Sequence, residues 1–132
     1  MTRRILLIVI IIEALTFFLA ASLHFGVRIM GLNEPQIIPA TIVEGLCAIF
    51  LSIAAIAIGT HSRSARGISI AAHLFCIAGV LLGIGALAMG RGPTTELNFY
   101  YHRIILAVLT IMLIILFTSP GRTALRSTLK VE

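Results

Sequence analysis

Residues 5–27 read ILLIVIIIEALTFFLAASLHFGV, and this stretch decides the fold. As a helix it is about 34 Å long, which is enough to cross the hydrocarbon core of a bilayer. Two of its residues, Glu13 and His24, are unfavourable in hydrocarbon. Their spacing places both side chains on one face of the helix, with Ala20 between them. We expect the rest of the chain to cover that face.

The composition is that of a membrane protein. Of the 132 residues, 59% are hydrophobic and only 11% are charged, which excludes a soluble domain of ordinary composition. The net charge of +5 does not indicate nucleic-acid binding, because Lys and Arg lie mainly in short segments that flank apolar runs. Anionic lipid headgroups are the partners that this pattern favours.

Three more apolar segments follow the first, separated by short connections rich in turn residues. Short connections favour antiparallel neighbours in an up-and-down bundle. We therefore predict an all-α fold, a single domain with four transmembrane helices. The expected helices are 5–27, 40–58, 68–89 and 100–117, followed by a basic tail at 121–132.

The basic residues predict the orientation. One side of the predicted bundle carries seven of the ten Lys and Arg residues and the other side carries three. The positive-inside rule then places both termini in the cytoplasm. The protein is expected to be integral to a bacterial-type cytoplasmic membrane. A cleaved signal sequence is the alternative for the first segment, but Glu13 interrupts its apolar run.

Five Glu and His residues fall within the predicted spans, and their depths divide them into two groups. His24, Glu44 and His102 are expected near the outer ends of three helices, as an outer cluster. Glu13 and His73 are expected closer to the cytoplasmic side, as an inner pair. Ionisable residues inside a membrane are rare and commonly mark binding or proton-handling sites.

Each group also has a structural interpretation. Glu13 and Glu44 could be protonated acids that hydrogen-bond across helices and fix their packing. His24 and His102 could contact lipid headgroups from positions near the interface. Alternatively, His24, Glu44 and His102 could bind a transition metal, or the two histidines could ligate the iron of haem b.

Three hypotheses for function remain open. The first is binding or transport of a cation, proton or small ligand by Glu13, Glu44 and the histidines, either as one chain or as a homo-oligomer. The second is a haem- or quinone-binding redox subunit. The third is a structural subunit whose acids pair with a membrane partner. No catalytic motif is present, which favours a role other than enzyme.

Two sequence features concern packing. Gly79 and Gly83 form a small-xxx-small pair, for which we expect contact within the bundle rather than dimerisation. Basic residues spaced by four in the tail predict a short helix after Gly121, with Leu125 dipping toward the membrane. The cations expected to contact anionic headgroups there are Arg122, Arg126 and Lys130.

Overall fold

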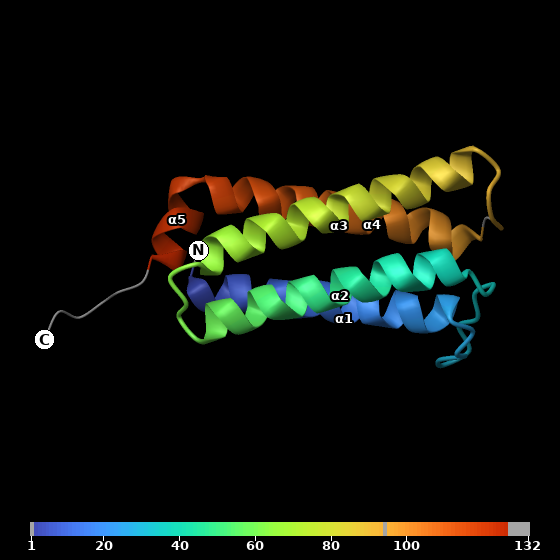
Figure 1. The fold of residues 1–132 in the computed structure, drawn as a ribbon, viewed down its shortest axis with the longest axis horizontal. Coiled ribbons are helices and arrows are strands. Elements are labelled where there is room, and N and C mark those ends of the chain that lie inside the picture. The colour runs from blue at the N-terminus through green and yellow to red at the C-terminus, as the bar shows by residue number, and fades with distance from the viewer. Residues whose placement is uncertain (1, 94, 127–132) are drawn as a thin grey trace, which may run out of the picture.

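The computed structural model describes residues 2–93 and 95–126, and within these ranges the chain is all-helical, as predicted. Four long helices are followed by a short one (Figure 1). Their bounds are α1 (Arg3–His24), α2 (Ile38–Gly59), α3 (Ala65–Ala88), α4 (Glu96–Phe117) and α5 (Ser119–Leu125). Each of the first four is long and apolar enough to span a membrane.

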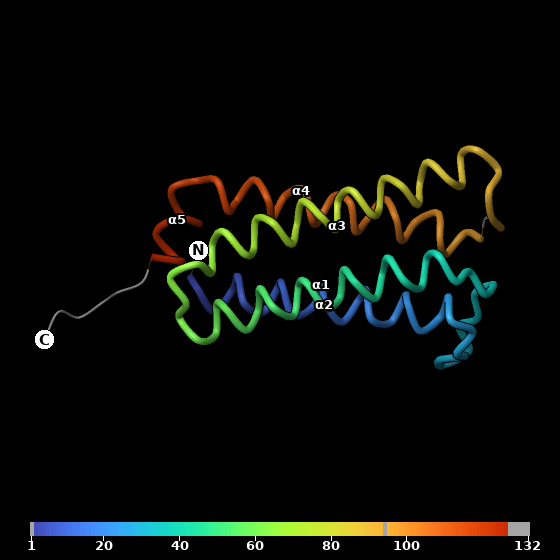
Figure 2. The backbone as a smooth tube through the Cα atoms, viewed as in Figure 1, coloured from blue at the N-terminus to red at the C-terminus, as the bar shows by residue number. Residues whose placement is uncertain are grey.

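The four long helices form an up-and-down bundle, which confirms the predicted architecture. In Figure 1, α2 and α3 form the near side of the bundle, and α1 and α4 lie behind them. The backbone trace in Figure 2 shows the start of α1 and the short α5 at the same end. We call this end the terminal end. The opposite end, which carries the connections 25–37 and 89–95, is the loop end.

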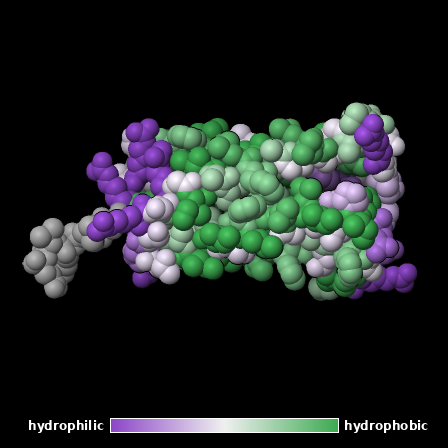
Figure 3. All heavy atoms as spheres, in the orientation of Figure 1, coloured by the Kyte–Doolittle hydropathy of each residue, from purple (hydrophilic) through white to green (hydrophobic). Residues whose placement is uncertain are grey.

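The surface of the bundle matches a membrane environment. Figure 3 shows an apolar band between two ends where hydrophilic residues gather. Large apolar side chains on this band are exposed in the chain, among them Ile8, Phe18, Ile56, Leu82 and Ile114. A soluble protein rarely exposes an apolar surface of this extent, so lipid is the solvent that fits it.

Glycines end α1 and α3 earlier than the apolar runs suggest. Gly26 has a φ of +100°, and the backbone N–H of Val27 donates to the carbonyl oxygen of Ser22. This is the hydrogen-bonding pattern of a helix terminated by a left-handed residue. The first span therefore ends at His24 instead of residue 27. Gly90, with a φ of +69°, ends α3 in the same way.

The fourth helix begins earlier than predicted, and the reason is its N-cap. The hydroxyl oxygen of Thr95 accepts from the backbone N–H of Asn98 at 3.1 Å and donates to Oε2 of Glu34 at 2.7 Å. The first bond satisfies a free backbone donor in the first turn of α4, and the second attaches the start of α4 to the 25–37 connection. The helix thus begins at Glu96, which places His102 inside the bundle rather than at its edge.

The prediction for the tail was wrong in two respects. The short helix α5 begins at Ser119, before Gly121, and it folds back against α3 and α4. Gly121 lies so close to the carbonyl oxygen of Ile115 that there is no space for a Cβ atom. Leu125 is buried in the protein core instead of dipping into the membrane. Lys130 lies outside the described residues.

Candidate functional site

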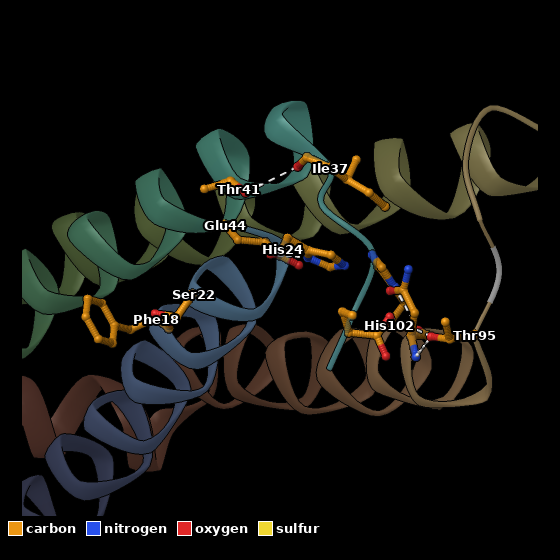
Figure 4. Close-up of polar contacts among 10 residues, drawn as sticks. Phe18, Ser22, His24, Ile37, Thr41, Glu44, Thr95 and His102 are labelled. Atoms are coloured by element: carbon orange, nitrogen blue, oxygen red, sulfur yellow. Dashed lines mark hydrogen bonds and ion pairs between the residues drawn. The ribbon is translucent and has the colours of Figure 1, made fainter. Parts of the chain in front are cut away.

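His24 and Glu44 form a buried pair between α1 and α2. The Nδ1 atom of His24 lies 2.7 Å from Oε2 of Glu44, and the two residues are 3% and 5% exposed. Figure 4 shows the two side chains together, His24 from the last turn of α1 and Glu44 from the second turn of α2. His24 therefore faces the protein, not the lipid headgroups.

Glu13 and His73 form a second buried pair, nearer the terminal end. The Oε2 atom of Glu13 lies 3.1 Å from Nε2 of His73, although the angle between them does not satisfy a hydrogen bond. On the other side of the ring, Nδ1 donates to the carbonyl oxygen of Ser69 at 2.7 Å. The structure thus brings together the two residues that the sequence assigned to an inner pair.

His102 does not join the His24–Glu44 pair. Its Nδ1 atom donates to the carbonyl oxygen of Asn98 at 2.9 Å, one turn earlier on α4. Figure 4 marks no hydrogen bond or ion pair between His102 and either of the other two side chains. Its Nε2 atom would be 2.7 Å from a Cβ atom added at Gly83, so the ring packs against the backbone of α3.

The metal hypothesis gains no support from these positions. Among residues 2–93 and 95–126, no group of three or more His, Cys, Asp or Glu residues could hold a metal ion. The predicted ligands His24 and Glu44 contact each other, whereas His102 contacts its own helix and Gly83. The reason is steric, because the glycine lets α3 approach the imidazole and occupy the space beside it.

A pocket of about 390 Å³ lies between α2, α3 and α4 in the loop-end half of the bundle. We call it the loop-end pocket. His24, Glu44 and His102 all line it, together with two residues that the sequence analysis missed, Asn98 and Tyr101. Its remaining walls are mainly apolar, including Ile37, Val43, Val80, Leu82 and Leu87.

Four side chains that line this pocket carry a buried polar atom with no hydrogen-bond partner in the described chain. These atoms are Nε2 of His24, Oε1 of Glu44, Oδ1 of Asn98 and the hydroxyl of Tyr101. Leaving such an atom unpaired costs about 1–3 kcal/mol, so most buried polar groups in proteins are paired. Atoms of Arg3, Glu13 and His73 also lack a partner, but they lie away from this pocket. The four around the pocket are the ones that a polar group inside it can pair with.

A second, smaller cavity adjoins the first on the side of α1 and α4. Its volume is about 100 Å³, and His24, Asn98 and Tyr101 line both spaces. These three side chains therefore form the partition between the two cavities, whereas Glu44 lines only the larger one.

Tyr101 and Asn98 could have been found from the spacing on α4. Asn98, Tyr101 and His102 are at positions i, i+3 and i+4, so they share one face of the helix. The helix predicted from the sequence begins at residue 100, so this face was not recognised. Tyr100 is exposed. Tyr101 points inward, and its ring lies edge-on to Phe17 of α1 with 6.4 Å between centroids.

Gly79 and Gly83 make the pocket possible, and they act within the bundle. A Cβ atom at Gly79 would be 2.8 Å from Cγ1 of Val43 on α2, and Gly83 faces His102 on α4. The small-xxx-small pair is therefore used for contacts between helices of one chain, as expected. Because both glycines lack side chains, α2 and α4 can bring their polar residues close to α3.

The basic residues at the terminal end have partners within the protein. Arg3 donates from Nε to the carbonyl oxygen of Ile58 at 2.9 Å, and Arg66 donates to that of Leu116 at 2.9 Å. Both acceptors are in the last turn of a long helix, where the helix dipole favours a cation. Arg122 donates to the carbonyl oxygen of Phe117, and Arg126 is exposed. Contact of the tail with anionic headgroups stays a prediction.

Comparison of the chain with protein families, with curated proteins and with solved structures found no match.

Proposed function

We propose that this protein is a small membrane-embedded binding protein, and that the loop-end pocket holds its ligand. The observation that carries the proposal is the set of four unpaired polar atoms around a pocket of about 390 Å³. Ligand pockets commonly have this composition, with apolar walls and a few polar groups that fix the orientation of the ligand. Ionisable residues buried inside a membrane bundle support the same conclusion.

Among the unpaired buried atoms of the side chains that line the pocket, acceptors outnumber donors. Arg91, which can only donate, also lines the pocket, but its side chain is exposed. Oε1 of Glu44 and Oδ1 of Asn98 can accept hydrogen bonds. Nε2 of His102 also accepts when the ring is neutral, because the proton is on Nδ1, where it bonds the Asn98 carbonyl. Only His24 and Tyr101 can serve in either role. The ligand that fits is a cation or a small molecule that carries hydroxyl or amino donors.

Binding is better supported than passage through a single chain. Toward the terminal end, the bundle is filled by buried apolar side chains that include Leu6, Ile10, Leu51, Ile58 and Leu116. The Glu13–His73 pair lies within this packed half and does not line the loop-end pocket. Transport of a ligand larger than a proton would therefore need these helices to move apart.

The proposal is tested by purifying the protein in mild detergent and identifying the small molecules that it retains by native mass spectrometry. We expect a retained molecule with hydroxyl or amino groups, and weaker retention in Glu44→Gln and Tyr101→Phe. Thr110→Val is the matched control, because Thr110 is an exposed residue elsewhere on α4 that bonds only Leu106. Equal retention by all variants, or no retained molecule, would contradict the proposal.

The same preparation tests the redox hypothesis. A visible spectrum and a metal assay would detect haem or a transition metal, and His24→Ala and His102→Ala would remove it. This outcome would replace the proposal made here, since a cofactor rather than a donor-bearing ligand would then occupy the pocket.

A further inference from the structure

The loop-end pocket has an opening toward the membrane. Pro39, Ala40 and Val43 of α2 line one side of it, and Leu82, Ala86 and Leu87 of α3 line the other. Leu82 is 71% exposed and Pro39 is also exposed, so these walls reach the outer surface of the bundle. Figure 3 shows a hollow on the face formed by α2 and α3, with hydrophilic atoms visible inside it.

The opening lies at a depth where lipid surrounds the bundle. Glu44 is six residues from the start of α2 at Ile38, which corresponds to about 9 Å along the helix axis. The exposed apolar side chain of Leu82 lines the opening. An opening with apolar edges at this depth faces hydrocarbon chains.

The interior and the opening of the pocket therefore differ in polarity. Its interior holds unpaired polar atoms of His24, Glu44, Asn98 and Tyr101. Its opening is lined mainly by apolar side chains, with the exposed Arg91 as the one Lys or Arg among the described lining residues. A ligand that fills both parts must itself have a polar head and an apolar body. A small water-soluble molecule would leave the apolar part empty, and a hydrocarbon would leave the polar atoms unpaired.

We propose that the ligand is a lipid-soluble amphiphile that enters from the bilayer between α2 and α3. Its head is a hydroxyl, which donates to Glu44 or Asn98, or an amine, which can donate to both, and its chain leaves through the opening into the lipid. The inference rests on the proposed function and adds to it the class of ligand and the route of entry. The head sets the affinity, because moving a chain from lipid to an apolar protein wall changes its environment little.

The test uses the full-length protein in vesicles and three probes with the same chain, each carrying a photoreactive diazirine in that chain. The probes are hexadecanol, hexadecylamine and hexadecanoate. We expect the alcohol or the amine to label residues at the opening, such as Val43 and Leu82, and to be displaced by the same compound without the diazirine. Hexadecanoate should label poorly, because its carboxylate offers no donor to Glu44 and Asn98 and the exposed Arg91 is the lining residue that it can pair with.

Two substitutions on α3 test the route of entry from the bilayer independently of the binding site. Ala86→Phe fills the opening, whereas Ala78→Phe adds the same side chain at an exposed position that does not line the pocket. We expect Ala86→Phe to lower specific labelling about ten-fold and Ala78→Phe to leave it unchanged. Tyr101→Phe and Glu44→Gln should each lower it by about ten-fold, as for one lost hydrogen bond.

The outcomes distinguish the two proposals. If a water-soluble amine or diol binds and depends on Glu44 and Tyr101, but Ala86→Phe has no effect, entry from the bilayer is overturned while the binding function stands. If hexadecanoate labels best, the proposal that the head of the ligand carries a hydrogen-bond donor is overturned. If no probe binds and native mass spectrometry finds no retained molecule, both proposals fail.

Discussion

Oε2 of Glu13 and Nε2 of His73 lie 3.1 Å apart in a fully buried part of the bundle, too close for two bare acceptors, although the angle does not satisfy a hydrogen bond. The other ring nitrogen, Nδ1, already carries a proton, since it donates to the carbonyl oxygen of Ser69. Nε2 is therefore an acceptor for a protonated Glu13, or the donor of an imidazolium to the carboxylate. Both arrangements leave the pair without net charge, which avoids burying an unpaired ion.

This geometry predicts different effects for two substitutions of Glu13. In Glu13→Gln the amide N–H can donate to Nε2 of His73, so we expect the stability to change by less than about 1 kcal/mol. In Glu13→Leu that nitrogen is buried without a partner, and a loss of about 1–3 kcal/mol is expected. The measurement is unfolding of the detergent-solubilised protein. A Leu variant as stable as the Gln variant would mean that the contact does not form.

The glycines of α3 provide a matched pair of substitutions. A Cβ atom at Gly83 would lie 2.7 Å from Nε2 of His102, whereas one at Gly85 would have no neighbour within 4 Å. We expect Gly83→Ala to displace His102 and cost about 1–3 kcal/mol, as for overpacking of a core. Gly85→Ala should be neutral or stabilising by up to about 1 kcal/mol. Thermal unfolding measures both, and equal effects would contradict the packing described here.

The orientation of the bundle can be tested with reporter fusions. The sequence assigns seven of the ten Lys and Arg residues to the side that carries both chain termini, so the positive-inside rule predicts that this side is cytoplasmic. A reporter after Glu132 should be active in the cytoplasm, and one inserted at Gly92 in the loop-end connection should be active outside. The opposite orientation would show that the basic residues at the terminal end do not set the topology. Their role would then be to make contacts within the protein, such as that of Arg3 with the carbonyl oxygen of Ile58.

The exposed cations of the tail predict that the thermal stability of the protein depends on the charge of the surrounding lipid. Each Lys or Arg near an anionic surface contributes about 1 kcal/mol, and salt weakens this attraction. The thermal stability of the reconstituted protein should therefore rise with the fraction of anionic lipid and should rise less in Arg126→Glu. Arg122 is a poorer target for substitution, since it also donates to the carbonyl oxygen of Phe117. No difference between neutral and anionic vesicles would refute the headgroup contact.

The sequence by itself determined the number of long helices, their approximate bounds and the antiparallel order. The physical reason is that a bilayer accepts only long apolar helices, and short connections leave little choice in how they pair. The depth of each ionisable residue followed from the same bounds. Glu13 with His73 and His24 with Glu44 could therefore be assigned to common levels, and the structure places each pair in contact.

Only the tertiary structure decided which side chains at one level meet. His24, Glu44 and His102 are at similar depth, yet His102 bonds its own helix and packs on Gly83. Depth follows from position along a helix, but contact also depends on the rotation of each helix and on the distance between axes. Those are set by side-chain packing across the bundle, which hydropathy does not encode. The start of α4 at Thr95 turned Tyr101 inward and completed the pocket, through a hydrogen bond to Glu34 that lies 61 residues earlier in the chain.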